Sequence, residues 1–190
     1  MQKNKIKTNV ILLAGVPGVG KTLLASKFSK IIDCEILNRD HIRNKIFPKK
    51  YLDHSHSQNE IATKTLLLVL ESLIIYNHPH YIILDGKPFS RKNEINLVKK
   101  LIDKLFAQLI IVHCMASVEI ITKRLNLDKK NNIDHLLRNP ILESKIYDSE
   151  KMINEFDKID LPHIVISTNN SINDAASECI EKIKKFNINL

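Results

Sequence analysis

The sequence predicts an α/β fold of three layers, with a five-stranded parallel sheet between two layers of helices, formed by residues 1–190 as a single domain. Two observations predict this fold. Short apolar runs of strand length alternate along the chain with longer stretches whose apolar residues recur at helical spacing. A glycine-rich segment, residues 15–22, joins the first apolar run directly to the first helical stretch. A chain of 190 residues is long enough to bury a substantial core in one such domain.

Each strand is predicted from a short apolar run that is bounded by polar or turn-forming residues. The expected strands cover residues 8–14, 35–37, 81–85, 109–114 and 163–167. Helices are predicted between them from apolar residues at helical spacing, over residues 21–32, 57–77, 90–105, 117–125 and 172–183. Residues 126–140 are polar, charged and only weakly periodic, so we expect a mobile loop there.

Three of the expected helices begin at a serine that can accept a hydrogen bond from the first helical turn. Ser57 and Glu60 match a capping box at the start of the long second helix, which is apolar on nearly all sides and is therefore expected to be buried. Ser90 and Ser117 are expected to begin the next two helices.

The segment between the first strand and the first helix is a complete G-x-x-x-x-G-K-[ST] phosphate loop. Its backbone N–H groups and the helix N-terminus favour an anion, Lys21 would reach the β- and γ-phosphates, and the Thr22 hydroxyl would ligate Mg²⁺. A glycine-rich turn that binds nothing is the alternative, but every motif position is filled and both flanks fit. We expect ATP to contact Gly15, Val16, Pro17, Gly18, Val19, Gly20, Lys21, Thr22 and Leu23.

Composition restricts the other partners. The net charge of +8 suits a protein that handles polyphosphate, although a solvated basic surface explains it equally well. Three widely spaced cysteines without a CxxC pair indicate reduced thiols rather than a disulfide or zinc framework. No apolar run is long enough to span a membrane, so we expect a cytoplasmic protein without a membrane partner.

The motifs of other nucleotide-binding classes are absent from the sequence. A GTPase needs a D-x-x-G switch and an N-K-x-D motif, but Gly86 is the only glycine outside the loop and residues 131–134 lack the lysine. AAA+ machines and helicases carry a paired acidic motif after an apolar strand, whereas Asp85 is followed by Gly86. A small nucleoside-triphosphate phosphotransferase remains.

Three further residues are candidates for binding the acceptor. Asp40 and Arg43 follow the second strand at i,i+3 spacing, so they face the same way if Asp40 opens a short helix. A capping Asp with a surface Arg is the alternative. Asp85 ends the third strand, where a carboxylate could hold a magnesium-bound water or the acceptor; a turn-forming Asp is the alternative.

Residues 35–43, the phosphate loop and residues 84–86 together resemble the small P-loop kinases that include polynucleotide 5′-hydroxyl kinases and AAA-domain kinases. Gluconate kinase, chloramphenicol phosphotransferase and zeta-type toxins are more distant relatives. The resemblance implies the strand order 2-3-1-4-5 and a lid over about residues 124–140. It also implies Asp40 as general base, Arg43 as a contact to a substrate phosphate and Arg124 as a lid cation on the ATP phosphates.

Two positions depart from the family pattern. Arg39 stands where the family has a serine, and Leu127 replaces the second lid arginine, leaving Lys123, Lys129, Lys130 or Arg138 to substitute. Residues 168–170, after the last strand, lie where such kinases often contact adenine.

The sequence therefore predicts a kinase that uses ATP and Mg²⁺ to phosphorylate a hydroxyl of a nucleic acid, a nucleotide or a small metabolite. An ATPase or a nucleotide-binding regulatory module without an acceptor is the alternative. The sequence leaves the oligomeric state open.

Overall fold

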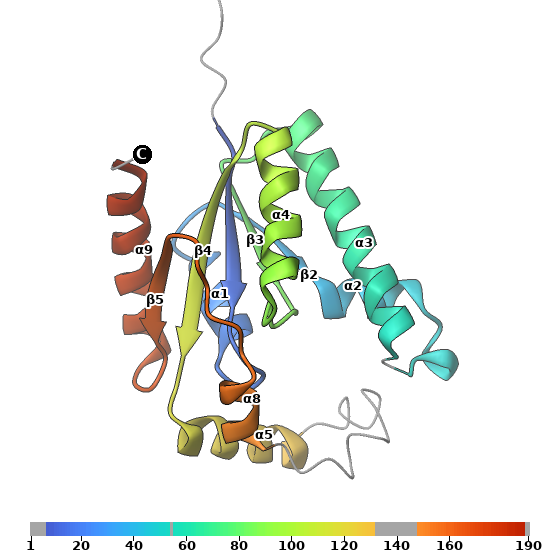
Figure 1. Cartoon of the computed structure of the whole chain (residues 1–190), viewed down its shortest axis with the longest axis vertical. Coiled ribbons are helices and arrows are strands. Elements are labelled where there is room, and N and C mark those ends of the chain that lie inside the picture. Colours follow the sequence, from blue (N-terminus) through green and yellow to red (C-terminus); the bar gives the residue numbers. More distant parts are fainter. Residues whose placement is uncertain (1–6, 54, 132–147, 189–190) are drawn as a thin grey trace, which may run out of the picture.

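The computed structural model describes residues 7–53, 55–131 and 148–188. Five parallel strands form one sheet in the order β2-β3-β1-β4-β5, as expected (Figure 1). The strands are β1 (Asn9–Ala14), β2 (Glu35–Asn38), β3 (Tyr81–Asp85), β4 (Gln108–Met115) and β5 (His163–Ser167). Because all five run the same way, their carboxyl ends share one edge of the sheet, where open α/β sheets bind ligands.

Helices cover both faces of the sheet. The described helices are α1 (Lys21–Phe28), α2 (Arg39–Ile46), α3 (His56–Ser72), α4 (Lys92–Lys104), α5 (Val118–Asn131), α8 (Ser149–Asn154) and α9 (Ile172–Ile188). Apolar side chains of α1 and α9 pack on one face, and those of α3 and α4 pack on the other. The helices α5 and α8 lie beyond the carboxyl ends of the strands (Figure 1). The predicted three-layer α/β fold is confirmed.

The central strand shows why the sheet is stable. All six residues of β1 are buried, and alternate side chains serve different cores. Ile11 and Leu13 belong to the α1–α9 core, whereas Val10, Leu12 and Ala14 belong to the α3–α4 core. Because helices cover both faces of this strand, it is apolar from Val10 to Ala14, which accounts for the unbroken apolar run in the sequence.

Two expectations about α3 are wrong. The N-cap is Ser55, whose side chain accepts from the Gln58 N–H, so Ser57 does not start a capping box. The helix continues into a π-helical turn, Leu73–Asn77, which matches the expected length. It is not buried on all sides, because Leu68 is 66% exposed. The buried apolar side chains of α3 form one stripe, Ala62, Leu66 and Leu70, and Leu67 packs against the same core while only partly buried.

Three helix boundaries also differ from expectation. The first helix ends at Phe28 rather than at residue 32. After it, the N–H groups of residues 30 and 31 donate to the carbonyls three residues earlier, those of Lys27 and Phe28, which is the 3₁₀ pattern. Arg91, not Ser90, is the N-cap of α4, and the carboxylate of Glu94 accepts from the Arg91 N–H at 3.3 Å. Residues 126–131, expected in a loop, continue α5. The rest of the expected loop, from residue 132, lies outside the described residues.

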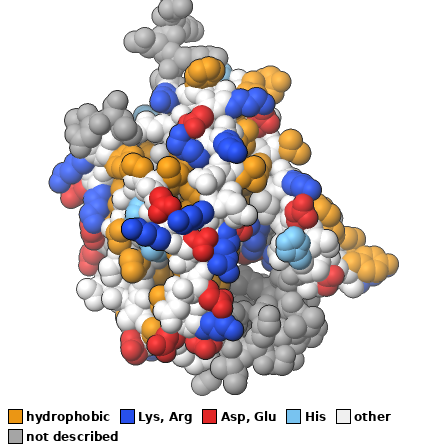
Figure 2. Space-filling model, viewed as in Figure 1, with side chains coloured by type: hydrophobic (Ala, Val, Ile, Leu, Met, Phe, Trp, Pro, Cys, Tyr) orange, Lys and Arg blue, Asp and Glu red, His pale blue; other side chains and the backbone are white. Residues whose placement is uncertain are grey.

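On the face of the molecule shown in Figure 2, basic and acidic side chains are interspersed, and neither sign of charge is gathered into a separate patch. This arrangement fits the interpretation of the basic balance as a solvated surface. None of the helices in the described ranges has the length and apolarity needed to cross a membrane.

Candidate active site

The phosphate loop lies between β1 and α1 and is held by β4 and by the connection that follows β3. Gly15 has a φ of +142°, and a Cβ at this position would lie 2.6 Å from the Cys114 carbonyl oxygen of β4. On the other side, the Gly15 N–H donates to the Pro88 carbonyl at 2.9 Å. Only glycine permits this approach of the loop to β4. The loop is therefore fixed at the carboxyl edge of the sheet, as the motif predicts.

Lys21 lies inside the curve of this loop. Its Nζ donates to the Gly15 carbonyl at 2.7 Å and to the Val16 carbonyl at 3.0 Å, and the residue is 9% exposed. Burial lowers the pKa of Lys21, while the thiol of Cys114 and the carboxylates of Asp85 and Asp40 act in the opposite direction. The ammonium group therefore occupies the position from which a cation can exchange two carbonyl partners for a bound phosphate. The next two residues, Thr22 and Leu23, are exposed.

Asp85 is joined to the second strand by a buried hydrogen bond. Asp85 and Asn38 are register partners at the ends of β3 and β2, and Asn38 Nδ2 donates to Asp85 Oδ2 at 2.6 Å. Asn38 is also the N-cap of α2, since its Oδ1 accepts from the His41 N–H at 2.9 Å. Among the described residues, the other Asp85 oxygen is buried without a hydrogen-bond partner. A buried carboxylate oxygen beside a phosphate loop suits a water molecule of the Mg²⁺ shell.

Asp40 lies in the first turn of α2 and is held by two arginines. Its Oδ1 is 2.9 Å from Arg39 Nη2 and 2.9 Å from Arg43 Nη1, so the predicted i,i+3 pair forms. Arg43 also donates to Asn59 Oδ1 of α3 at 2.5 Å, and its side chain is 4% exposed. The alternative of a capping Asp with a surface Arg is therefore wrong, because Asn38 is the cap and Arg43 is buried. The carboxylate of Asp40 itself remains partly exposed.

Arg124 approaches the loop from α5, on the side of β5. Its Nη1 donates to the Val19 carbonyl at 3.2 Å and to Thr168 Oγ1 at 3.1 Å, and its Nη2 donates to the Thr168 carbonyl at 2.6 Å. Thr168 Oγ1 in turn donates to the Val19 carbonyl, so α5, the loop and the end of β5 form one network. Arg138 lies outside the described residues.

The strand order separates the site into two sides. Asp40 follows β2 at one edge of the sheet, and the Thr168 contact of Arg124 follows β5 at the other, with Lys21 after the central strand. Asp40 and Asp85 lie close enough to Lys21 to influence its pKa. The contacts of Asn38 with Asp85 and of Asn59 with Arg43 were not predicted from the sequence. An Asn before a helix start is a signal for a cap, but nothing in the local sequence indicates that Asn59 contacts Arg43.

The comparisons with known proteins agree with this architecture. A family model described as an AAA domain matches residues 10–135, which is more than half of the chain. A search of the curated proteins found no significant match.

Solved structures share the fold at low sequence identity. A candidate kinase from Chloroflexus aurantiacus is 14% identical over 92% of this chain and 98% of its own, with a TM-score of 0.71. The APS kinase of Mycobacterium tuberculosis in complex with AMPPNP and APS is 15% identical over 94% and 98%, with a TM-score of 0.64. A gluconokinase from Sinorhizobium meliloti is 9% identical over 98% and 97%, with a TM-score of 0.63. The chain therefore belongs to the family of AAA domains, and its fold is that of the small P-loop kinases.

Proposed function

We propose that this protein is an ATP-dependent phosphotransferase that moves the γ-phosphoryl group of ATP to a hydroxyl group. The observation that carries the proposal is the position of Asp40. Its carboxylate lies at the same sheet edge as the phosphate loop, is fixed by Arg39 and Arg43, and is 35% exposed. A nucleotide-binding module without an acceptor has no need of a positioned, accessible carboxylate beside the loop.

The proposed roles follow from the geometry. The loop amides and Lys21 bind the phosphates of ATP, and Asp40 orients the acceptor hydroxyl and takes its proton as the phosphoryl group transfers. Arg43 holds Asp40 in place and contributes positive charge toward an anionic acceptor. Arg124 supplies a cation on the β5 side of the phosphate loop, opposite to the side on which Asp40 lies. In a loose phosphoryl transition state, such positioning and charge neutralisation provide most of the catalysis.

The residues also fit a magnesium ion. Thr22 would ligate Mg²⁺ directly, and Asp85 would hold one of its waters through the oxygen that has no protein partner in the described structure. When bound, Mg²⁺ neutralises charge on the β- and γ-phosphates. The shared fold of an APS kinase and a gluconokinase supports the kinase class and leaves the acceptor to be identified from this chain's own residues.

The test is transfer from γ-labelled ATP to a panel of hydroxyl compounds by the wild-type protein and by Asp40→Asn. We expect ATP turnover to rise with an acceptor, and Asp40→Asn to lower transfer by about 100-fold or more. Binding of a non-hydrolysable ATP analogue should be nearly unchanged in the variant, since no hydrogen bond or ion pair of the described residues joins Asp40 to the phosphate loop. ATP turnover that no acceptor increases would establish the ATPase alternative. Transfer at the wild-type rate by Asp40→Asn would assign the base elsewhere, with Asp85 as the next candidate.

A further inference from the structure

The outward side of α3 carries a line of exposed apolar side chains. Leu68 and Tyr76 are 66% and 77% exposed, and Ile61, Val69 and Ile75 are each exposed by more than a third. Ile61, Leu68 and Ile75 recur every seven residues, so they follow one side of α3 and of the π-helical turn that continues it. Single exposed apolar residues are ordinary on a protein surface, but a contiguous apolar patch marks an interaction site. We call these five residues the α3 row.

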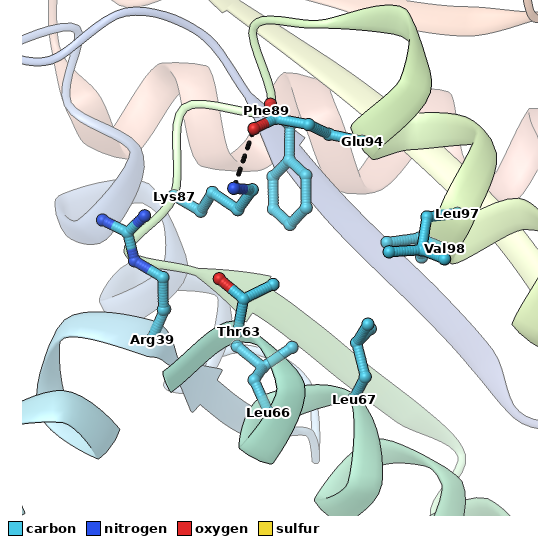
Figure 3. A pocket seen from close by; sticks show the side chains of 9 residues that line it. All are labelled: Arg39, Thr63, Leu66, Leu67, Lys87, Phe89, Glu94, Leu97 and Val98. Carbon is cyan, nitrogen blue, oxygen red and sulfur yellow. Dashed lines mark ion pairs between the residues drawn. The ribbon is translucent and has the colours of Figure 1, made fainter. Parts of the chain in front are cut away.

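The inward side of α3 is occupied by the protein itself. Figure 3 shows Leu66 and Leu67 of α3 facing Phe89 and the α4 side chains Leu97 and Val98 across a small cavity of about 60 Å³. In Figure 1, α3 lies at the right-hand margin of the molecule, and in Figure 2 hydrophobic side chains follow the same margin. The α3 row therefore faces solvent in the described structure, where a second molecule can reach it.

Small side chains stand between the large ones of this side of the helix. Ile61, Thr65, Leu68, Ser72 and Ile75 follow one another at alternating steps of four and three residues, which is the a and d spacing of paired helices. The large residues hold one kind of position, and the small hydroxyl residues hold the other. In an antiparallel pair of helices the a positions of one lie opposite the d positions of the other, so a large side chain would meet a small one at each of these levels.

Charge selects one register of an antiparallel pair. Lys64 and Glu71 are seven residues apart, so they lie on the same margin of α3, and they carry opposite charges. With Thr65 of one helix opposite Leu68 of the other copy, Lys64 of each copy comes beside Glu71 of the other, which gives two equivalent ion pairs. In the neighbouring register, with Leu68 opposite Ser72, the two Glu71 carboxylates would face each other. The first register is therefore favoured.

Both charged residues are available for this exchange of partners. Lys64 pairs with Glu60 of its own helix at 2.8 Å, and both side chains are more than half exposed. Glu71 pairs with Lys104 of α4 at 3.5 Å, and the lysine is 74% exposed. Ion pairs this exposed contribute little to stability, so a second copy can offer better partners at little cost.

We propose that the protein forms a homodimer in which the α3 helices of two copies pack antiparallel about a two-fold axis at the level of residues 65–68. The occupant of the α3 row is a second copy because the surface is complementary to itself in side-chain size and in charge, as a two-fold interface requires. A parallel pair would place Lys64 and Glu71 beside the apolar Val69 and Tyr76 of the other copy. The proposal goes beyond the proposed function and does not depend on it.

Sedimentation analysis of the full chain tests the dimer. A contact between two helices is small for a specific interface, so we expect a Kd of about 1–100 µM. Leu68→Asp should raise the Kd by about tenfold or more, because it places a carboxylate in the interface of both copies. The matched control is Ile31→Asp, at a position that is 56% exposed and outside α3, and it should dimerise as wild type. Circular dichroism checks that both variants fold.

Two outcomes of this measurement would overturn the proposal. A protein that remains monomeric at about 500 µM does not use the α3 row for self-association, and the row would then serve a different protein. A dimer that Leu68→Asp leaves intact would place the interface on another surface.

Exchange of the two charges tests the register. Lys64→Glu and Glu71→Lys should each raise the Kd by about fivefold or more at low ionic strength, because each brings like charges together twice. The double variant carrying both substitutions should return close to the wild-type Kd, because the same two ion pairs form with their charges reversed. Single variants with a wild-type Kd, or a double variant no better than the single ones, would overturn the antiparallel register.

Discussion

Asp85 is a fully buried carboxylate beside a phosphate loop, and this environment makes its role testable. One oxygen accepts from Asn38, and the other has no hydrogen-bond partner among the described residues. Burying a charge without a full set of partners costs stability, so a protein gains nothing from it unless a ligand completes the site. If the protein binds a magnesium–nucleotide complex as proposed, a water molecule of the metal shell would complete the partners of this carboxylate.

We expect Asp85→Asn to weaken magnesium-dependent nucleotide binding by about tenfold or more, with the free energy of unfolding unchanged or higher. The asparagine can still accept from Asn38, but it lacks the negative charge that holds a magnesium-bound water. Calorimetric titration with and without Mg²⁺, together with urea unfolding, measures both effects. A large loss of stability with unchanged nucleotide affinity would show that Asp85 serves the fold.

Lys21 provides a second prediction at this scale, because burial lowers its pKa from the ordinary value of 10.5. Between the lowered pKa and 10.5 the unfolded chain binds more protons than the folded protein, so the free energy of unfolding rises with pH across that window. At pH values below the lowered pKa, Lys21 is protonated in both states, and the folded protein carries the full free-energy cost of burying the ammonium group.

Lys21→Met should therefore be at least as stable as wild type at pH 7 and should lose the Lys21 contribution to this rise with pH. It should also lose nucleotide binding, because the ammonium group faces the loop. Urea unfolding at several pH values between 7 and 10.5, with nucleotide titration at pH 7, measures the difference. An unchanged pH profile together with wild-type nucleotide affinity would contradict the placement of this charge.

At the scale of elements, the start of α2 is held against the end of β3 by close backbone packing. Gly86 has a φ of +77°, and a Cβ there would lie 2.7 Å from Asn38 Oδ1 and 2.9 Å from the backbone nitrogens of Arg39 and Asp40. The helix that carries Asp40 can therefore pack this closely only because residue 86, directly after β3, is a glycine without a side chain.

We expect Gly86→Ala to cost about 3 kcal/mol or more of stability and to displace Asp40, because it adds steric overlap to backbone strain. The matched variant is Gly20→Ala, where φ is +96° but the nearest atom to a Cβ is 3.4 Å away. This variant should cost only about 1–2 kcal/mol from its backbone conformation. Urea unfolding measures both, and equal losses would contradict the packing of Gly86 against α2.

The start of α3 offers a smaller and cleaner test. Ser55 accepts from the Gln58 N–H, whereas the side chain of Ser57 bonds only to Ser55 among the contacts described. Ser55→Ala should lower the free energy of unfolding by about 1 kcal/mol, and Ser57→Ala should change it by less than half of that. Chemical unfolding of both variants decides between them, and a larger effect at Ser57 would restore the capping box that the sequence predicted.

At the scale of the whole molecule, the parallel sheet collects distant segments at one edge. The phosphate loop follows β1, Asp40 follows β2, Asp85 ends β3 and the Arg124 partner Thr168 follows β5. A ligand bound at this edge would therefore lie among segments from most of the chain, and it should stabilise the domain as one unit.

A non-hydrolysable ATP analogue with Mg²⁺, at about 100 times its Kd, should add about 2.7 kcal/mol and raise Tm by about 5–10 °C. Adenosine lacks the phosphates and should leave Tm nearly unchanged. Thermal unfolding with each ligand, for wild type and Lys21→Met, measures the effect. An equal shift in the variant would show that the nucleotide binds away from the loop.

The sequence by itself determined the features that depend on neighbours in the chain. The alternation of apolar runs set the five strands, and the Gly15–Thr22 spacing set the phosphate loop, because each geometry involves residues only a few positions apart. The i,i+3 spacing likewise predicted that Asp40 and Arg43 face the same way if Asp40 opens a short helix. The strand order came from the family resemblance.

Only the tertiary structure decided which side chains are covered and which distant residues meet. Arg43 is buried because Asn59 of α3 binds it, and one side of α3 is exposed because the sheet covers a single stripe of that helix. Arg39 lines a cavity because α3 and α4 leave space beside it. These outcomes depend on packing between segments far apart in sequence. The spacing of residues within one segment does not indicate which distant segment packs against it.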